Sequence, residues 1–470
     1  MHYIAKTARG GPSVSWSSSM QQQPSSSPSD PWDQVPAILA RIQPPTIPAR
    51  DFRLDVFGAV GDGVKDCTEA FRAAIAAASE ADGGRIVVPA GDWLTGPIHL
   101  RSNIELHVAE GATVRFRTDA EAYLPMVLTR WEGVELYNYS PLIYAFECEN
   151  VAITGSGTLD GQGSNDTWWK WRDKVKFGWQ PGTPQQKPAR LMLFILGEHD
   201  VPVEARRFGE GYWLRPNMIQ PYRCRNILIE GVTIRNSPMW HIHCVLSQNI
   251  TIRKVTVIGH GPETDGANPE SCRDVLIEDC YFDTGDDCIA IKSGRNGDGR
   301  RINVPSENII VRNCVMRDGH GAIVIGSELT GGVRNVFAEN LEMDSRNLDR
   351  ALRIKTNSHR GGLVENIHMR NSVVKSLGGE VVQVNLDYEE GDTGKFTPIV
   401  RHIHVDNLVS QGGKIGLQLK AYERSPVQDV RITNCRFDGV EQPFELRHTQ
   451  DLHLANVTIN GITYNGEPEA

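Results

Sequence analysis

The chain of 470 residues has no long hydrophobic run and no excess of positive charge. No apolar stretch approaches the ~18 residues that a membrane-spanning helix needs. The formal net charge of -9 argues against nucleic-acid binders, which carry basic patches or stripes. We therefore expect neither a membrane nor a nucleic acid as a partner. A small anionic substrate is still allowed, because a few local cations can dominate the potential in a cleft.

The beginning of the chain lacks the apolar core of a secretory signal. Residues 1–11 carry positive charge but no run of roughly 7–15 apolar residues. The compartment is therefore unknown, and a periplasmic or secreted location is expected only if the true start lies upstream. The stretch from Ser17 to Pro31 is rich in Ser, Gln and Pro, which is typical of disorder. We predict that residues 1–50 are a disordered or low-complexity segment and that order begins near Asp51.

The nine cysteines include no CxxC pair, which removes support for a zinc ribbon or a thioredoxin-like site. Many of them stand inside repeating segments, for example Cys272, Cys280 and Cys314. This placement favours small buried residues over disulfides.

Helical periodicity is scarce as well. Asp66 can cap a helix with Glu69 three residues on, and Phe71, Ile75 and Ala78 follow at helical spacing. The pattern predicts one helix over residues 66–81. Beyond this helix, the chain is dominated by short strand patterns divided by glycines and polar turns.

Strand segments recur along the second half of the chain at intervals of about 22 to 36 residues. Each begins with a polar residue, often followed by Asn, and continues with alternating apolar positions. The nine segments are 225–230, 248–253, 273–278, 307–312, 334–339, 365–370, 401–406, 428–433 and 450–455.

Such units cannot bury their apolar faces alone and must stack. The period, the scarcity of helices and the recurrent Asn favour a parallel β-helix over a leucine-rich repeat or a propeller. We predict an all-β protein in which residues 51–470 form one single-stranded, right-handed parallel β-helix. The helix at 66–81 would cap its open N-terminal end.

The strand rhythm lapses over an insertion at about residues 163–223, which holds five of the ten tryptophans. Long loops in compact domains are usually functional. The sequence leaves open whether these side chains form a platform for sugar rings or pack the loop against the solenoid. They are Trp168, Trp169, Trp171, Trp179 and Trp213.

Aligning the repeats brings several charged residues into one phase on successive coils. Parallel coils rise about 4.8 Å each, so these residues would form a patch about 15 Å tall on one face. Its members are Asp265, Asp286, Asp287, His320, Arg353 and Lys355. Taken singly, each has a simpler explanation as a turn or a solvated strand face, and only their coincidence indicates a site.

This combination of side chains suits glycoside hydrolysis of an acidic sugar. One carboxylic acid must protonate the leaving oxygen, and one carboxylate must activate water or attack. Repulsion among Asp265, Asp286 and Asp287 should raise the pKa of at least one of them. Arg353 and Lys355 can bind a substrate carboxylate.

Four ordered motifs resemble glycoside hydrolase family 28, the polygalacturonases. They are Glu263-Thr-Asp-Gly266, Gly285-Asp-Asp287, Gly319-His-Gly321 and Arg353-Ile-Lys355. The resemblance covers roughly residues 51–460 and includes Phe57-Gly-Ala-Val-Gly-Asp-Gly63, which is similar to the entry segment of pectin-active β-helices.

The resemblance implies an inverting hydrolase of α-1,4-linked galacturonic acid that uses no cofactor and no metal ion. It makes Asp286 the general acid, Asp265 and Asp287 the pair that activates water, and His320 a residue that tunes the acid. Substrate binding would involve Arg353, Lys355, Glu263 and Lys292. Inversion implies carboxylates ~6.5–9.5 Å apart, and direct stacking would give less, so we expect their side chains to splay.

Glu263 departs from the family pattern, which typically has Asn there, and this puts the identity of the substrate in doubt. The segment Arg215-Pro-Asn-Met-Ile-Gln-Pro-Tyr222, with the insertion before it, is similar to bacterial exo-acting members. Exo action is therefore favoured, on pectin or its oligosaccharides. Rhamnogalacturonan and xylogalacturonan stay open as substrates.

Two other functions compete with hydrolysis. A calcium-dependent pectate lyase could use the same fold, with the three aspartates as metal ligands. A non-catalytic carbohydrate-binding β-helix would leave the acidic cluster without a reaction. The sequence does not indicate an oligomeric state.

Overall fold

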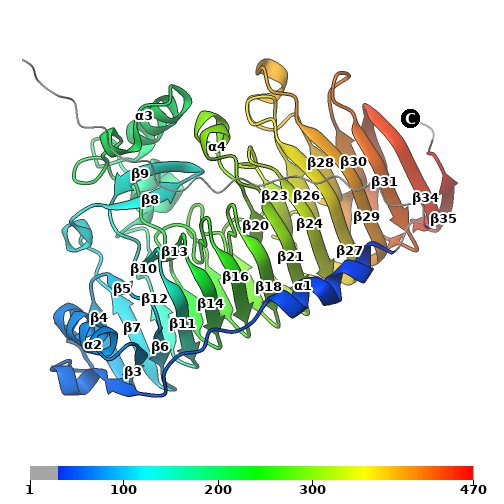
Figure 1. Ribbon diagram of the computed structural model, residues 1–470. Coiled ribbons are helices and arrows are strands. Elements are labelled where there is room, and N and C mark those ends of the chain that lie inside the picture. Colours follow the sequence, from blue (N-terminus) through cyan, green and yellow to red (C-terminus); the bar gives the residue numbers. More distant parts are fainter. Residues whose placement is uncertain (1–29, 469–470) are drawn as a thin grey trace, which may run out of the picture.

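Strands stack in register along most of the chain in the computed structural model, which describes residues 30–468. They form three faces of a right-handed parallel β-helix, as predicted (Figure 1). The first face contains β1 (Asp51–Arg53), β3 (Gly84–Val88), β6 (Ile104–Val108), β11 (Glu149–Gly155), β14 (Arg225–Glu230), β16 (Gln248–Arg253), β18 (Arg273–Glu278), β21 (Ser306–Arg312), β24 (Val333–Glu339), β27 (Leu363–Ser376), β29 (Ile399–Ser410), β31 (Val427–Thr433) and β34 (Thr449–Ile459).

The second face turns away from the first after a bend in each coil. It contains β2 (Asp62–Asp66), β4 (Gly91–Thr95), β7 (Ala112–Phe116), β12 (Thr158–Asp160), β15 (Thr233–Arg235), β17 (Thr256–Gly259), β19 (Tyr281–Thr284), β22 (Val315–Met316), β25 (Glu342–Asp344) and β32 (Arg436–Phe437). The later parts of β27 and β29 continue it, and β35 (Ile462–Gly466) pairs antiparallel with β34 at the C-terminal end.

The third face carries the candidate site. It contains β5 (Ile98–Leu100), β10 (Ile143–Phe146), β13 (Ile219–Tyr222), β20 (Ile289–Ile291), β23 (Ile323–Gly326), β26 (Leu352–Lys355), β28 (Glu380–Asn385), β30 (Gly413–Lys420) and β33 (Val440–Arg447). Between β13 and β20, two coils contribute isolated parallel bridges in place of strands, one through Ile242 and Val245 and the next through Ala267 and Glu270.

The recurrent Asn has a direct structural reason. In the repeated segments it adopts the left-handed backbone conformation, with φ of 58° at Asn226, 57° at Asn249 and 56° at Asn335. Asn tolerates this region better than most residues. Its side chain also donates to the equivalent residue one coil earlier, at 2.7 Å from Asn249 to Asn226 and 3.0 Å from Asn366 to Asn335. All nine predicted strand segments lie within strands of the first face and pair in the predicted register.

The predicted capping helix is present as α2 (Thr68–Glu80) and covers the N-terminal end of the coil stack (Figure 1). The predicted capping box is wrong. Cys67 occupies the N-cap position, although Asp66 still accepts a hydrogen bond of 2.9 Å from the Thr68 N–H. Glu69 pairs with Arg72 at 2.6 Å instead of reaching back to the helix start.

The expectation that order begins near Asp51 is wrong for residues 30–50. They form a 3₁₀ turn, η1 (Pro31–Gln34), and α1 (Val35–Arg41), followed by an extended segment along the outside of the first face (Figure 1). The apolar side of this strap buries Trp32, Val35, Ile38 and Ile42 against outward-facing apolar residues of the sheet. Burial of these few large side chains favours an ordered segment despite the polar composition of the first 50 residues. The predicted disorder over 1–29 lies outside the described residues.

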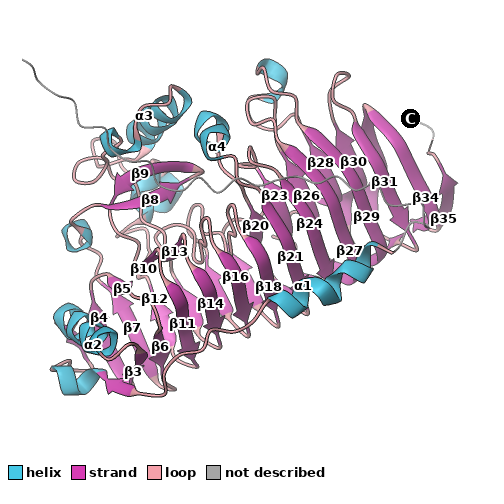
Figure 2. Ribbon diagram, viewed as in Figure 1, coloured by secondary structure: helices cyan, strands magenta, loops and turns pink. Residues whose placement is uncertain are grey.

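Two more helices and a hairpin stand outside the coils, which the sequence did not indicate. Figure 2 shows α3 (Lys187–Glu198), α4 (Asn296–Ile302) and the antiparallel hairpin of β8 (Val127–Trp131) and β9 (Val134–Asn138) gathered beside one region of the stack. Apolar side chains of α3 and the hairpin form a separate core with Phe208, Leu214, Met239 and Trp240. Short 3₁₀ turns lie between these elements: η2 (Leu54–Phe57), η3 (Ala120–Tyr123), η4 (Trp169–Arg172), η5 (Val175–Phe177), η6 (Val203–Ala205) and η7 (Gly391–Thr393).

The insertion packs through its aromatic residues. Trp168 and Trp171 are buried, with ring centroids 4.9 Å apart, and Trp171 meets Trp213 at 5.1 Å. The indole N–H of Trp169 donates to the Ser237 carbonyl at 2.9 Å. Of the two open interpretations, packing against the solenoid is therefore the one that these contacts support.

All nine cysteines are buried and free, as their positions in the repeats indicated. Over residues 30–468, no helix combines the length and the apolar character needed to cross a membrane.

Candidate active site

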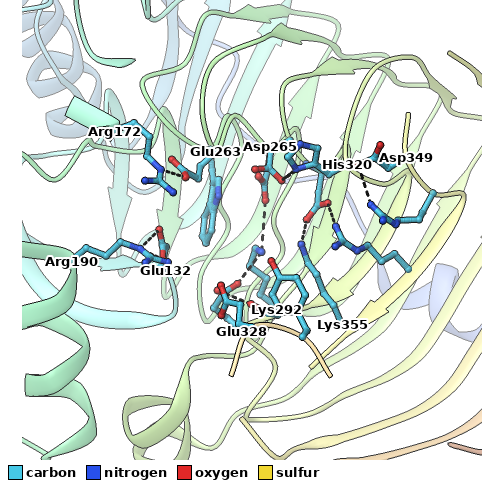
Figure 3. Close-up of a pocket in the computed structure, with 18 of the residues that line it drawn as sticks. Glu132, Arg172, Arg190, Glu263, Asp265, Lys292, His320, Glu328, Asp349 and Lys355 are labelled. Atoms are coloured by element: carbon cyan, nitrogen blue, oxygen red, sulfur yellow. Dashed lines mark hydrogen bonds and ion pairs between the residues drawn. The ribbon is translucent and has the colours of Figure 1, made fainter. Parts of the chain in front are cut away.

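A cleft of about 400 Å³ opens on the third face, beside the insertion and the hairpin (Figure 3). Its lining holds nearly equal numbers of acidic and basic side chains. The acids are Glu132, Glu263, Asp265, Asp286, Asp287, Glu328, Asp349 and Glu389, and the bases are Arg172, Lys174, Arg190, Lys292, Arg350, Arg353 and Lys355. His320, Trp240, Ser327 and Tyr388 complete it.

The register of the third face brings the predicted residues together. Ala267 pairs with Ile289, which pairs with Ile323, which in turn pairs with Leu352. Because Asp265 and Asp287 each precede a member of this column by two residues, they lie on adjacent coils in equivalent positions. All six residues of the predicted patch line the one cleft.

The three aspartates converge, contrary to the expected splaying. One oxygen from each of Asp265, Asp286 and Asp287 lies within 4.8 Å of the other two. Protein cations allow this approach by offsetting the repulsion: the Lys355 Nζ is 2.7 Å from Asp287 Oδ2, and the Lys292 Nζ is 3.7 Å from Asp265 Oδ2. The carboxylate spacing therefore does not argue for inversion in this chain.

Asp286 forms a pair with His320 at the open side of the cluster. His320 Nδ1 lies 3.0 Å from Asp286 Oδ1. The hydrogen bond and the negative charge of Asp286 raise the pKa of His320 to about 9. Burial acts to raise the pKa of Asp286, but the His320 bond and nearby lysines bring it below its usual range. At neutral pH this pair therefore holds a proton on the imidazole side.

One aspartate does have a raised pKa, as repulsion within the cluster predicted. It is Asp265, because it is buried and faces Asp286, and the pKa of its carboxyl lies well above the ordinary range. Its Oδ2 accepts a hydrogen bond of 2.6 Å from the Asn268 amide. The aspartate assigned as the acid by resemblance is thus a different one from that with the raised pKa.

The residues predicted to bind substrate differ in how much of their charge is already matched. Arg353 donates to Gln383 at 3.1 Å and lies 3.6 Å from Asp287, with its guanidinium 5.6 Å from the Tyr388 ring. Lys292 is buried and bonds Glu328 at 3.0 Å. One carboxylate oxygen of Glu263 accepts a hydrogen bond from Arg172, and the other accepts one from Arg215.

Sequence reasoning missed several residues of the cleft because they come from insertions or follow strands. Glu132 stands in the turn of the hairpin, Arg190 on α3 and Tyr388 in the loop after β28. Glu328 could have been found from the repeat, since Ser327-Glu328 follows β23 as Ser293 follows β20 in the paired register.

Two groups of side chains in the described part of the chain have a geometry that could hold a metal ion. The first is the aspartate cluster itself, whose charge is already balanced by Lys292, Lys355 and His320. The second is His260 with Asp283 and Asp318 beside the cleft, where His260 Nε2 already pairs with Asp283 at 3.1 Å.

Comparison with known proteins places this geometry in a family. The profile described as glycosyl hydrolases family 28 matches residues 210–450, which include all four motifs. The chain belongs to this family. It is therefore a glycoside hydrolase with the pectin-active β-helix fold.

Known relatives align with this family 28 chain along most of its length. A probable polygalacturonase of Vitis vinifera is 30% identical over 395 residues, which cover 80% of this chain and 72% of the relative. An exo-poly-alpha-D-galacturonosidase of Dickeya chrysanthemi is 27% identical, over 88% of this chain and 71% of the relative. The structure of an exopolygalacturonase from Thermotoga maritima has a TM-score of 0.90 at 50% identity, covering 92% of this chain and 96% of that one.

Proposed function

We propose that this family 28 enzyme hydrolyses α-1,4-linked galacturonic acid, in pectin or its oligosaccharides, from chain ends. The observation that supports it is a cluster of three aspartates inside a cleft that is rich in cations and bounded at one end by an insertion. Arginine and lysine suit the carboxylates of a uronic acid polymer. The names of the Dickeya and Thermotoga relatives agree with action at chain ends.

In the proposed reaction, Asp286 delivers the proton to the glycosidic oxygen. The bond between this oxygen and C1 breaks, and the leaving sugar keeps the electron pair and the proton. A water molecule held by Asp265 and Asp287 adds to C1 and gives up a proton to Asp287, because the raised pKa of Asp265 favours its protonated form. Arg353 and Lys355 hold the uronate at the cleavage site, and attack of water from the opposite face would invert the anomeric carbon.

His320 accounts for the low pKa of Asp286 in this scheme. The pair His320–Asp286 holds one proton, and the form with that proton on Asp286 is the competent acid. The pKa of coupled groups belongs to the pair rather than to either residue. Hydrogen bonding to the glycosidic oxygen would draw the proton to Asp286 as the bond breaks.

The pH profile of kcat/KM tests this pairing. We expect its basic limb near pH 9, where His320 loses its proton, since the pKa of His320 is about 9. In His320→Gln the limb should shift to lower pH, because Asp286 then has to hold the proton without its partner. A basic limb unchanged in the variant would contradict a shared proton.

Product analysis tests the proposed substrate and mode of action. Polygalacturonic acid incubated with the enzyme and a chelator should release monomeric galacturonate from the first time point, as seen by chromatography. A ladder of oligomers would indicate internal cleavage, and an unsaturated product absorbing in the ultraviolet would indicate a lyase.

Two further outcomes separate the remaining alternatives. Turnover only of rhamnogalacturonan or xylogalacturonan would move the substrate to decorated pectins. Binding with no product from any of these polymers would favour a carbohydrate-binding protein without activity.

A further inference from the structure

Glu263 joins the insertion to the coil that carries Asp265. Its carboxylate accepts from the Arg172 Nε and from the Arg215 Nη2. Arg172 comes from η4 in the insertion and is partly exposed to the cleft, where it also bonds Asp173 at 2.9 Å. The three charged groups therefore form one cluster, two residues from a catalytic aspartate.

Arg215 depends on this cluster for charge compensation. Its side chain is fully buried. Its other N–H groups donate to the carbonyl oxygens of Pro238 and Pro262, at 2.8 and 2.7 Å, and to Gln186 at 2.9 Å. These partners are neutral, so Glu263 is the anion in direct contact with it. A buried cation without such a partner is strongly unfavourable.

The backbone at Glu263 indicates that the side chain is needed there. Its φ is 49°, in the left-handed region. This region is uncommon for residues other than Gly, Asn and Asp. Glu263 therefore holds a conformation that its own backbone disfavours, and its two arginine contacts offset that cost.

Close packing next to Glu263 seats the same part of the insertion on the coil. A Cβ on Gly261 would come within 2.3 Å of the Trp169 ring, so only Gly allows this approach. Figure 3 shows Arg172 and Glu263 together at one side of the cleft, with Arg190 and Glu132 beside them and Asp265 next in line. The first four, without Asp265, form the wall at that end of the cleft.

We propose that Arg172, Glu263 and Arg215 form a specificity-determining latch. The latch fixes the insertion across one end of the cleft and limits the sugars on that side of the cleavage point to a single uronate. Glu263 is then a positioning residue rather than a contact of the substrate. This inference rests on the proposed function, since it explains why that function would release monomers.

The test is the size of the first product from a hexamer of galacturonic acid labelled at its reducing end. Arg172→Met opens the latch at the cleft and keeps the pairing of Glu263 with buried Arg215. We expect the ratio of dimer to monomer among first products to rise at least about tenfold, as is typical when one pocket contact is lost. Glu263→Gln should do the same and should also speed proteolytic cleavage within residues 163–218.

Lys170→Met is the matched control, because it removes a cation from the same 3₁₀ turn at a position outside the cleft lining. It should leave the product pattern unchanged. If the wild type, Arg172→Lys and Arg172→Met all release monomer as the sole first product, the latch is overturned while the proposed function stands. Absence of galacturonate from the wild type would instead overturn the proposed function.

Discussion

Asp286→Asn should lower kcat on oligogalacturonates on the order of 10³–10⁴-fold, the range typical for loss of general acid catalysis together with its pairing. The effect should depend on the leaving group. Galacturonosyl fluoride needs no protonation to lose fluoride, so the variant should recover most of its activity on it. Initial rates on the two substrates, measured with the same enzyme preparation, give the comparison.

Asp265→Asn and Asp287→Asn separate the two roles. A residue that activates water is needed whatever the leaving group, so these variants should stay inactive on the fluoride as well. If Asp265→Asn were rescued by fluoride and Asp286→Asn were not, the acid would be Asp265, in line with its raised pKa. Asp283→Asn, on β19 beside the cleft, serves as a control and should keep activity within a few-fold.

Glu270→Gln should destabilise the fold by about 3–5 kcal/mol, the cost typical of breaking a buried ion pair from one side. Glu270, Arg130 and His243 are all fully buried. Glu270 lies 3.2 Å from the Arg130 Nε and 2.7 Å from the His243 Nε2. Because Arg130 belongs to β8, the substitution would leave a buried cation between the hairpin and the coil of Asp265. Urea unfolding followed by tryptophan fluorescence measures the change.

The matched control is Glu278→Gln, which breaks the more exposed pair with Arg312 at 2.7 Å. It should cost less than about 1 kcal/mol, as surface pairs do. The pKa of Glu270 is lowered: burial opposes this, and Arg130 and His243 outweigh it. Its contribution should therefore be present above the ordinary pKa of Glu and be lost as pH falls through the lower folded value. Equal losses for the two variants would contradict a special role for the buried pair.

The repeats made most of the fold predictable from sequence. Segments such as 225–230 and 248–253 carry a signal of period two that suits strands stacked in register, and a left-handed residue, most often Asn, marks the start of each. The strap over residues 30–50 gave no such signal. The strap is held on the sheet by Trp32 and three aliphatic residues. These four stand among polar residues and prolines and form no such pattern.

The candidate site, too, was predictable in one part and not in another. Asp265, Asp286, Asp287, His320, Arg353 and Lys355 belong to the coils, so coil spacing alone brings them together. Their ionisation was harder to foresee, because it depends on Lys292 and on the His320 contact. The wall of the cleft could not be derived, since Glu132, Arg172 and Arg190 lie in segments that follow no repeat.

The N-terminal strap changes how a stack of this kind can come apart. In a solenoid each coil contacts only its neighbours, so the ends can fray one coil at a time. Here the Gln43 backbone exchanges two hydrogen bonds with the Asn249 side chain, Arg41 pairs with Asp274, and Trp32 packs on Phe337, while β1 stays in the first coil. The strap thus links the first coil directly to the coils of Asn249, Asp274 and Phe337. Opening any coil between these attachment points would also disturb contacts several coils away, so the coils that carry the aspartate cluster should open together rather than one at a time.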